Sequence, residues 1–230
     1  AIWILALPVL LQQAMAALVG MVDKMMAGNL PQGVVVPALD AIGVGSYVGW
    51  LIGICMTGLG IGAQAIIARA IGRGDGPEAH IALRQALGLS VLWGAMVGVA
   101  MWLLAEPLGH YTSLSPEAIT FCTQYVSMLA LAMPFCGIML VGSMCLHGAG
   151  ETTMPSMIAI AVNVVNIFSS WALSGVVLRF GEFSVPNLFP IDPATGGVLG
   201  IAGGTALSYA VGAGLTLWVM RRGVKDLRLE

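Results

Sequence analysis

Six long apolar stretches, separated by short polar connections, dominate the sequence. Each is long enough for a helix that crosses a bilayer, which needs about 20 apolar residues. They cover residues 2–27, 41–71, 81–104, 119–146, 154–178 and 198–220. Transmembrane barrel strands would instead give alternating segments of about ten residues, and the sequence shows no such pattern. The pattern therefore predicts an all-α membrane protein, in which residues 1–230 form a single bundle of six transmembrane helices.

The amino-acid composition excludes several classes of protein. Hydrophobic residues make up 58% of the chain and charged residues only 9%, and the mean hydropathy is +0.94. Soluble domains carry about 25% charged residues, so neither a soluble enzyme nor a disordered chain fits. The net charge of −2 and the lack of a basic stripe also argue against a nucleic-acid partner.

The basic residues predict how the helices are oriented, because cytoplasmic connections of membrane proteins are enriched in Lys and Arg. Seven of the nine basic residues flank the connection between the second and third stretches or follow the sixth: Arg69, Arg73, Arg84, Arg221, Arg222, Lys225 and Arg228. We therefore expect a multi-pass protein of the inner or plasma membrane with both termini in the cytoplasm. Because Ala1 stands almost inside an apolar stretch, we also expect the sequence to be an excerpt of a longer chain.

Asp23 is the one acidic residue well inside an apolar stretch. A carboxylate at mid-bilayer costs about 2.5–3.5 kcal/mol on insertion scales, so it is seldom kept without a use. At about 100° per residue, Gln12, Ala16, Gly20 and Ala27 lie within about 60° of it and form a small, polar helix face. We expect this face to meet protein or a watery cavity. The alternative is that the helix ends early and Asp23 lies at the outer interface.

The fifth stretch carries a second polar stripe. Asn163, Asn166, Ser170 and Ser174 follow the spacing i, i+3, i+7, i+11 and share an arc of about 80°. Their amide and hydroxyl oxygens could complete the oxygen shell of a small hard cation whose charge is balanced by one carboxylate. They could equally form interhelical hydrogen bonds worth about 0.6 kcal/mol each. The residues alone leave both interpretations open.

Motifs of catalysis are missing from the sequence. It has no GxSxG elbow, no HExxH pair and no paired intramembrane carboxylates. The histidines are too scattered for a metal trio. We therefore predict no enzymatic activity and no cofactor. Cysteines without CxxC spacing are expected to be packing residues: Cys55, Cys122, Cys136 and Cys145. Ridges of small residues should let helices approach closely: Gly45, Gly49, Gly53 and Thr57 in the second stretch, and Gly200, Gly204, Ser208 and Gly212 in the sixth.

Several segments resemble the multidrug and toxic compound extrusion (MATE) transporters. LALPVLLQQ followed by MVDKMMAG is similar to the first span of that family, and GLGIGAQAIIARAIGRGD to its second span and turn. HGAGETTMPSM resembles the turn before the fifth span, and NVVNIFSSW the Asn-rich start of that span. GVLGIAGGTALS resembles the small-residue opening of the sixth span. These similarities are colinear over nearly all 230 residues.

The resemblance implies a fold and a function for the chain. It would be the N-terminal six-helix half of a twelve-helix transporter, with the C-terminal six-span lobe missing from this sequence. Family members have a central cavity between two bundles and expel organic, often cationic, compounds in exchange for protons or sodium ions. The implied partners are a small organic substrate and the bilayer, and nothing beyond the transported ion acts as a cofactor.

Site residues carry over from the family by position. Asp23 matches the first-span acidic residue implicated in cation coupling, and Pro8 matches the first-span proline associated with helix bending. Asn166 matches the fifth-span asparagine of the cation site, and Ser208 matches a hydroxyl position in the sixth span. Ser170 stands where many prokaryotic members have a second Asp, so the site carries less negative charge.

These residues suggest a transport hypothesis. Protonation of Asp23, or a bound cation, would favour one packing of the first, fifth and sixth helices, and the ionised form another that holds a cationic substrate. Gln12, Asn163 and Ser174 are candidates for the substrate cavity. Lys24 stands where the family has a small neutral residue, and we expect it to extend to the outer interface. If it folds back instead, it could replace the cation and disable coupling.

Two alternatives to export stay open. A flippase for lipid-linked precursors of the same superfamily would need a basic cavity for a pyrophosphate, and no Lys or Arg lies in mid-span here. A noncatalytic membrane scaffold, or an incomplete fragment, would use the polar stripes only for packing.

Overall fold

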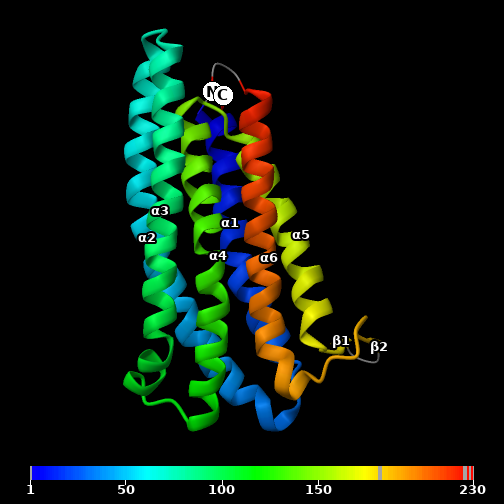
Figure 1. The fold of residues 1–230 in the computed structure, drawn as a ribbon. Coiled ribbons are helices and arrows are strands. Elements are labelled where there is room, and N and C mark those ends of the chain that lie inside the picture. The colour runs from blue at the N-terminus through cyan, green and yellow to red at the C-terminus, as the bar shows by residue number, and fades with distance from the viewer. Residues whose placement is uncertain (1, 181–182, 225–226, 228, 230) are drawn as a thin grey trace.

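The computed structural model describes residues 2–180, 183–224, 227 and 229. In this part of the chain, six helices run up and down, joined mostly by short turns (Figure 1). They are α1 (Ile2–Ala27), α2 (Gln32–Gly72), α3 (Gly76–Tyr111), α4 (Pro116–Gly148), α5 (Thr153–Ser174) and α6 (Pro193–Arg222), with the strands β1 (Leu178–Phe180) and β2 (Phe183–Val185) between the last two. Each helix is long and apolar enough to cross a membrane, which confirms the predicted six-helix membrane bundle.

Four helices begin earlier than the predicted starts at residues 41, 81, 119 and 198. α2 begins at Gln32 without a side-chain cap, whereas the first turns of α3, α4 and α6 are capped. The side chains of Asp75, Ser115 and Asp192 each accept a hydrogen bond from a backbone N–H in the first turn of α3, α4 and α6, at 3.0, 3.3 and 3.0 Å. Each of these helices also has a proline in its first two positions, where the missing N–H costs nothing. Polar residues thus extend the helices past the apolar runs.

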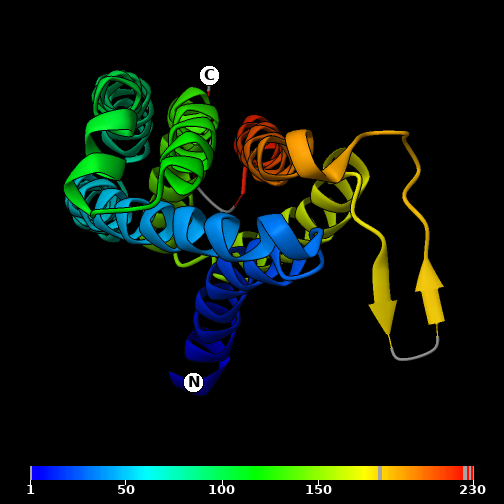
Figure 2. The same ribbon diagram turned by 90° about the horizontal axis from the view of Figure 1, so that it is seen from below.

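The predicted end of the fifth helix is wrong. α5 ends at Ser174 because Gly175 adopts the left-handed conformation with φ of +70°, a common helix stop that glycine adopts without strain. The chain then turns into the antiparallel pair β1–β2, in which Leu178 lies opposite Val185. This short hairpin extends away from the helices, as seen from below in Figure 2.

The helices form two groups around α4. α4 packs against α2, α3 and α6, while α5 packs against α6 and α1. α1 leans away from the other helices toward its N-terminus (Figure 2). Two buried apolar clusters fill the opposite ends of the bundle; the first includes Ile42, Met101, Val126 and Ile201, and the second Ile67, Leu83, Leu146 and Met220. Three of the four cysteines are buried as predicted, but Cys55 is exposed.

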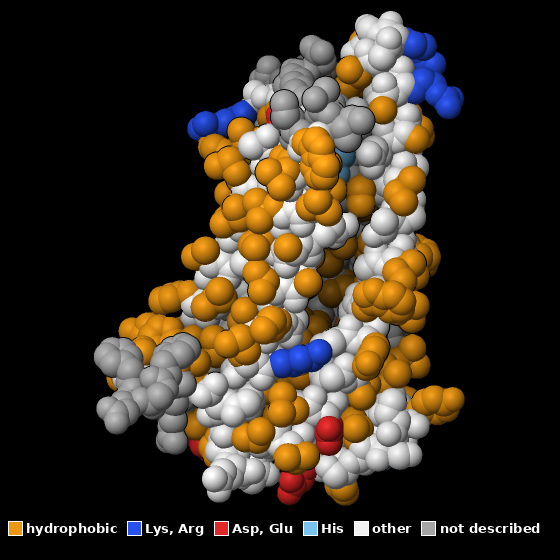
Figure 3. Space-filling view, turned by 180° about the vertical axis from the view of Figure 1, so that it is seen from behind, with side chains coloured by type: hydrophobic (Ala, Val, Ile, Leu, Met, Phe, Trp, Pro, Cys, Tyr) orange, Lys and Arg blue, Asp and Glu red, His pale blue; other side chains and the backbone are white. Residues whose placement is uncertain are grey.

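Basic side chains gather mainly at one end of the molecule. Apolar side chains cover the flanks, and Lys and Arg lie mainly at the end where both termini are found (Figures 1 and 3). Of the seven residues used to predict the orientation, Lys225 and Arg228 lie outside the described residues.

Candidate functional site

Asp23 lies inside the bundle, and its side chain is only 1% exposed. The Tyr125 hydroxyl of α4 donates a hydrogen bond to its Oδ2 at 2.6 Å. The Thr205 hydroxyl of α6 lies 2.9 Å from Oδ1 and 3.1 Å from Oδ2 and donates from the other side. The carboxylate of α1 is therefore bound by donors from two other helices.

The polar stripe of α5 continues this network. The Asn166 Nδ2 donates to Thr205 Oγ1 at 2.9 Å and to Ser170 Oγ at 3.4 Å. The Ser170 hydroxyl donates in turn to the Ile201 carbonyl of α6 at 3.2 Å. Asn166 and Ser170 are fully buried. The Asn166 Oδ1 is also buried and has no hydrogen-bond partner among the described residues, so an acceptor oxygen is left over beside the Thr205–Asp23 pair.

The negative charge of Asp23 has no basic partner in the described part of the chain. The ion pairs found there, Arg73 with Glu78 and His110 with Glu106, are surface pairs. Lys24, the next residue along α1, is exposed. An ionised carboxylate inside the bilayer is costly unless it is paired. The arrangement therefore favours a proton or a cation as the partner of Asp23.

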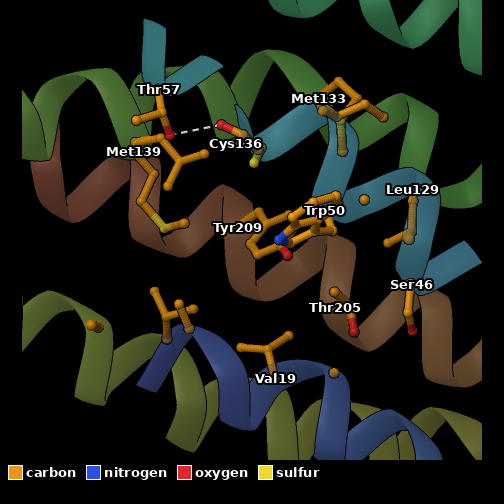
Figure 4. Close-up of a pocket in the computed structure, with 18 of the residues that line it drawn as sticks. Val19, Ser46, Trp50, Thr57, Leu129, Met133, Cys136, Met139, Thr205 and Tyr209 are labelled. Atoms are coloured by element: carbon orange, nitrogen blue, oxygen red, sulfur yellow. Dashed lines mark hydrogen bonds between the residues drawn. The ribbon is translucent and has the colours of Figure 1, made fainter. Parts of the chain in front are cut away.

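A cavity of about 470 Å³ opens beside this carboxylate, within the size range of small-molecule sites. Its walls come from all six helices, with α3 contributing Met101. Trp50 of α2 and Thr205 and Tyr209 of α6 are among the residues that line it (Figure 4). Gly49 and Gly53 also line it, and no atom lies within 4 Å of a Cβ placed on either. This part of the α2 ridge forms an open wall rather than a helix contact.

The structure brings together some of the predicted site residues but not all of them. Gln12 and Asn163 line the cavity with Asp23. Ser174 lies at the end of α5, where it donates to the Trp171 carbonyl at 3.1 Å, and it is not among the lining residues. Ser208 donates to the Thr205 carbonyl at 2.7 Å and does not bond to Asp23.

Pro8 lies in the first part of α1. Its carbonyl oxygen accepts a hydrogen bond from the Ser156 hydroxyl of α5 at 2.6 Å. A proline inside a helix removes one backbone hydrogen bond. The same position therefore combines a turn of α1 that lacks one backbone hydrogen bond with a hydrogen bond to α5. That α1 bends at Pro8 stays a prediction.

Sequence reasoning missed Tyr125 and Thr205, the two donors to Asp23. A tyrosine within the apolar run of α4 was one available signal, because a buried phenol hydroxyl needs a partner. Gly45 of α2 makes room for the Tyr125 ring, because a Cβ at this position would overlap it, but this contact is visible only in the structure. Thr205 precedes Ser208 by one helical turn, and the sequence does not distinguish which hydroxyl reaches the carboxylate.

Among the described residues, no group of three or more His, Cys, Asp or Glu side chains is placed to hold a metal ion. The oxygen-only set around Asp23 suits a proton or a hard monovalent cation better than a transition metal.

A six-helix membrane bundle with a buried, hydrogen-bonded carboxylate beside a cavity has the architecture of a membrane transporter. The sequence model named MatE matches residues 8–172, and the chain belongs to this family. The resemblance drawn from the motifs is thereby confirmed. The family comprises transporters rather than enzymes, in agreement with the prediction.

Curated relatives are similar to nearly the whole chain. A probable multidrug resistance protein NorM of Thermotoga maritima is 27% identical over 216 residues, which make up 94% of this chain and 43% of that protein. The multidrug resistance protein PmpM of Pseudomonas aeruginosa is 27% identical over 220 residues, 96% of this chain and 41% of that protein. The chain thus spans about two fifths of the length of these relatives.

A solved structure supports the fold. A crystal structure of a MATE protein in a bent conformation superposes with a TM-score of 0.80 at 21% identity. The superposition covers 98% of this chain and 46% of the other. This share is consistent with one six-helix half of a longer transporter.

Proposed function

We propose that this chain is the N-terminal lobe of a secondary active antiporter that exports organic, often cationic, compounds in exchange for protons or sodium ions. The observation that carries the proposal is the buried Asp23 carboxylate, which has hydrogen-bond donors but no basic partner among the described residues and lines a cavity of about 470 Å³. The names of the NorM and PmpM relatives support export of drug-like molecules.

Competition for Asp23 would couple the two movements. A proton or cation on the carboxylate neutralises its negative charge. The hydrogen-bond network of Tyr125, Thr205 and Asn166 then surrounds a neutral group instead of an anion. The ionised carboxylate attracts a cationic substrate into the cavity instead. Each ligand shifts the equilibrium between two packings of α1, α5 and α6 only as far as it binds one packing more tightly than the other. A difference of about 1.4 kcal/mol in binding free energy changes the ratio of the two populations tenfold.

The surroundings of the site disfavour the alternatives. A flippase for lipid-linked pyrophosphates needs cationic groups, and no Lys, Arg or His lines the described cavity. A scaffold has no use for a cavity whose wall is left open by Gly49 and Gly53. In the proposal the protein lies in the inner or plasma membrane with both ends cytoplasmic, pairs with a C-terminal six-span lobe, and needs no cofactor.

The proposal is tested with Asp23→Asn in the intact protein reconstituted in vesicles. Because the amide can neither release a proton nor balance a cation, dye efflux driven by an imposed ion gradient should fall at least about tenfold. Fluorescent organic-cation efflux measures this directly. Gradients of protons in sodium-free buffer and of sodium at constant pH identify the driving ion.

Asp40→Asn is the matched control, because Asp40 is an exposed carboxylate near the start of α2. It should leave efflux unchanged. Full transport by the Asp23→Asn protein would remove the basis of the antiport proposal.

A further inference from the structure

The connection between α5 and α6 presents large apolar side chains on its outside. Leu188 is 58% exposed and Phe189 is 53% exposed, and Val177, which precedes β1, is 39% exposed. None of the three lines the cavity. We call residues 186–191 the apolar turn. Apolar side chains that gather on a surface indicate that another molecule or a membrane covers them.

Hydrogen bonds hold the apolar turn in one conformation. The Asn187 Nδ2 donates to the Trp171 carbonyl of α5 and, at 3.4 Å, to the Val176 carbonyl. The Phe189 N–H donates to Asn187 Oδ1 at 2.9 Å, and the Ile191 N–H donates to the Phe189 carbonyl at 2.8 Å. The backbone that carries Leu188 and Phe189 is therefore fixed to the end of α5, and their exposure is a feature of the fold.

The length of α5 places this turn at the edge of the hydrocarbon core. α5 has 22 residues, which correspond to about 33 Å, and the core of a bilayer is about 30 Å thick. The helix starts near the end of the bundle where both termini lie (Figure 1). Its last residue, Ser174, therefore reaches the opposite boundary of the core. The lower ends of α2 and α4 continue past the hairpin in the same view.

The hairpin leaves the bundle sideways at this level. In the view along the helices from below, β1 and β2 extend outward from α5 and α6 (Figure 2). The two ends of the connection meet closely, because a Cβ at Gly175 would overlap the Ile191 carbonyl. A segment that runs across the helix direction at the boundary of the core lies in the plane of the membrane. Apolar side chains of such segments insert about 5–10 Å into the boundary between headgroups and acyl chains.

The apolar turn also continues the outer flank of α5. Large exposed apolar side chains recur along this helix with helical spacing: Met157, Ile160, Val164, Ile167 and Phe168. Trp171 is the next member of this series, and its ring packs against that of Phe168 with centroids 5.9 Å apart. Asn187 binds the carbonyl of this same Trp171. The turn thus extends an apolar flank of a membrane-spanning helix, which favours lipid over protein as its partner.

We propose that the apolar turn, together with Val177, is an interfacial anchor that inserts into the phospholipid leaflet at the end of the bundle opposite the termini. α5 and α6 pack backbone to backbone at Gly200 and Gly204, so the anchor sets the depth of both helices in the bilayer. This inference goes beyond the proposed function, because it concerns a surface outside the cavity and requires no ion coupling.

The test measures the depth of nitroxide labels in the intact protein, reconstituted in phosphatidylcholine vesicles. Labels are attached to Leu188→Cys or Phe189→Cys in a Cys55→Ala background, because Cys55 is an exposed native thiol. Collisions with oxygen, which concentrates among acyl chains, are compared with collisions with a water-soluble nickel chelate. Both labels should lie about 5–10 Å below the lipid phosphates.

Two further labels calibrate the measurement. Ser113→Cys, in the exposed turn between α3 and α4 at the same end of the bundle, should collide mainly with the nickel chelate. Val164→Cys, 62% exposed within α5, should collide mainly with oxygen. Labels at Leu188 and Phe189 that meet the nickel chelate as often as the Ser113 label would place the turn in water and overturn the proposal. Low access to both reagents would overturn it as well, because protein would then cover the turn.

A double variant tests whether the anchor sets the depth of the helices. Leu188→Ser combined with Phe189→Ser removes the apolar side chains and leaves the hydrogen bonds of Asn187 in place. A label on Val177→Cys should then collide more often with the nickel chelate. Tyr111→Ser, at an 89% exposed aromatic residue at the end of α3, should leave this label unchanged. An unchanged Val177 label in the double variant would refute the anchoring role. Depth is measured without an ion gradient, so this failure leaves the antiport proposal standing, and failure of antiport leaves the anchor standing.

Discussion

At the scale of single residues, the hydroxyl of Tyr125 is the closest donor to Asp23, at 2.6 Å. Replacing Tyr125 by Phe removes this hydroxyl and keeps the ring. Hydrogen bonds to charged groups contribute about 1.5–3 kcal/mol, whereas interhelical bonds in membranes average about 0.6 kcal/mol. We expect Tyr125→Phe to lower the free energy of unfolding by about 1–2 kcal/mol, as measured by denaturant titration in detergent.

Tyr47→Phe provides the comparison, because Tyr47 of α2 is 78% exposed and makes no hydrogen bond recorded for the described residues. Its unfolding free energy should match that of the unmodified protein. If the two phenylalanine variants are equally stable, the Tyr125–Asp23 bond does not stabilise the fold.

The sequence predicts the acidic side of this network but not its donors. Asp23 and Asn166 stand out because a polar residue in an apolar run is costly, and the cost is visible without a structure. The donors Tyr125 and Thr205 are 102 and 182 positions away from Asp23 in the sequence. Which hydroxyl reaches it depends on the rotation and axial shift of α4 and α6. Thr205 and Ser208 lie one turn apart on the same face of α6, so helical periodicity alone does not show which of the two hydroxyls reaches Asp23.

At the scale of helices, the contact of α5 with α6 depends on glycine. A Cβ at Gly204 would overlap the backbone of Ser170, and one at Gly200 would overlap the backbone of Leu173. Backbone atoms cannot move aside as a flexible side chain can. We expect Gly204→Ala to separate the two helices, displace Thr205 and Ser170, and destabilise the protein by about 1–3 kcal/mol, with reduced dye efflux.

Gly214→Ala is the matched variant on the same helix, because nothing lies within 4 Å of a Cβ built there. The thermal unfolding midpoints of both variants in detergent measure the effect. Equal midpoints would show that α5 and α6 can separate without cost.

The ends of the helices are harder to predict than their existence. Apolar runs mark the part of each helix that faces lipid, while polar caps such as Asp75 and Ser115 extend the helix into the connections. At the end of α5 the apolar run continues through Val176 and Val177, but Gly175 has already reversed the backbone. The change of direction at Gly175 depends on a single backbone φ angle, and the hydropathy of the sequence carries no information about that angle.

At the scale of the whole molecule, the number of spans and their alternating direction follow from hydropathy, since the bilayer sets the length of each helix. The cavity does not follow from it. Its walls combine Asn163 of α5 and Tyr209 of α6 with Gly49 and Gly53 of α2, where no atom lies within 4 Å of an added Cβ. A ridge of glycines predicts close packing, and here only Gly45 of the α2 ridge is packed that way, against Tyr125.

The orientation of the whole bundle is the remaining prediction. Arg73 lies in the turn between α2 and α3, at the end where both termini are found, and Ser113 lies in the turn between α3 and α4 at the opposite end. Both residues are exposed. If Lys and Arg mark the cytoplasmic side, a membrane-impermeant maleimide should label Ser113→Cys in intact cells and Arg73→Cys only after permeabilisation. Each variant is made with Cys55→Ala, because Cys55 is the exposed native thiol of the described chain. The reverse labelling pattern would contradict the predicted topology and place the end that holds both termini on the outer side of the membrane.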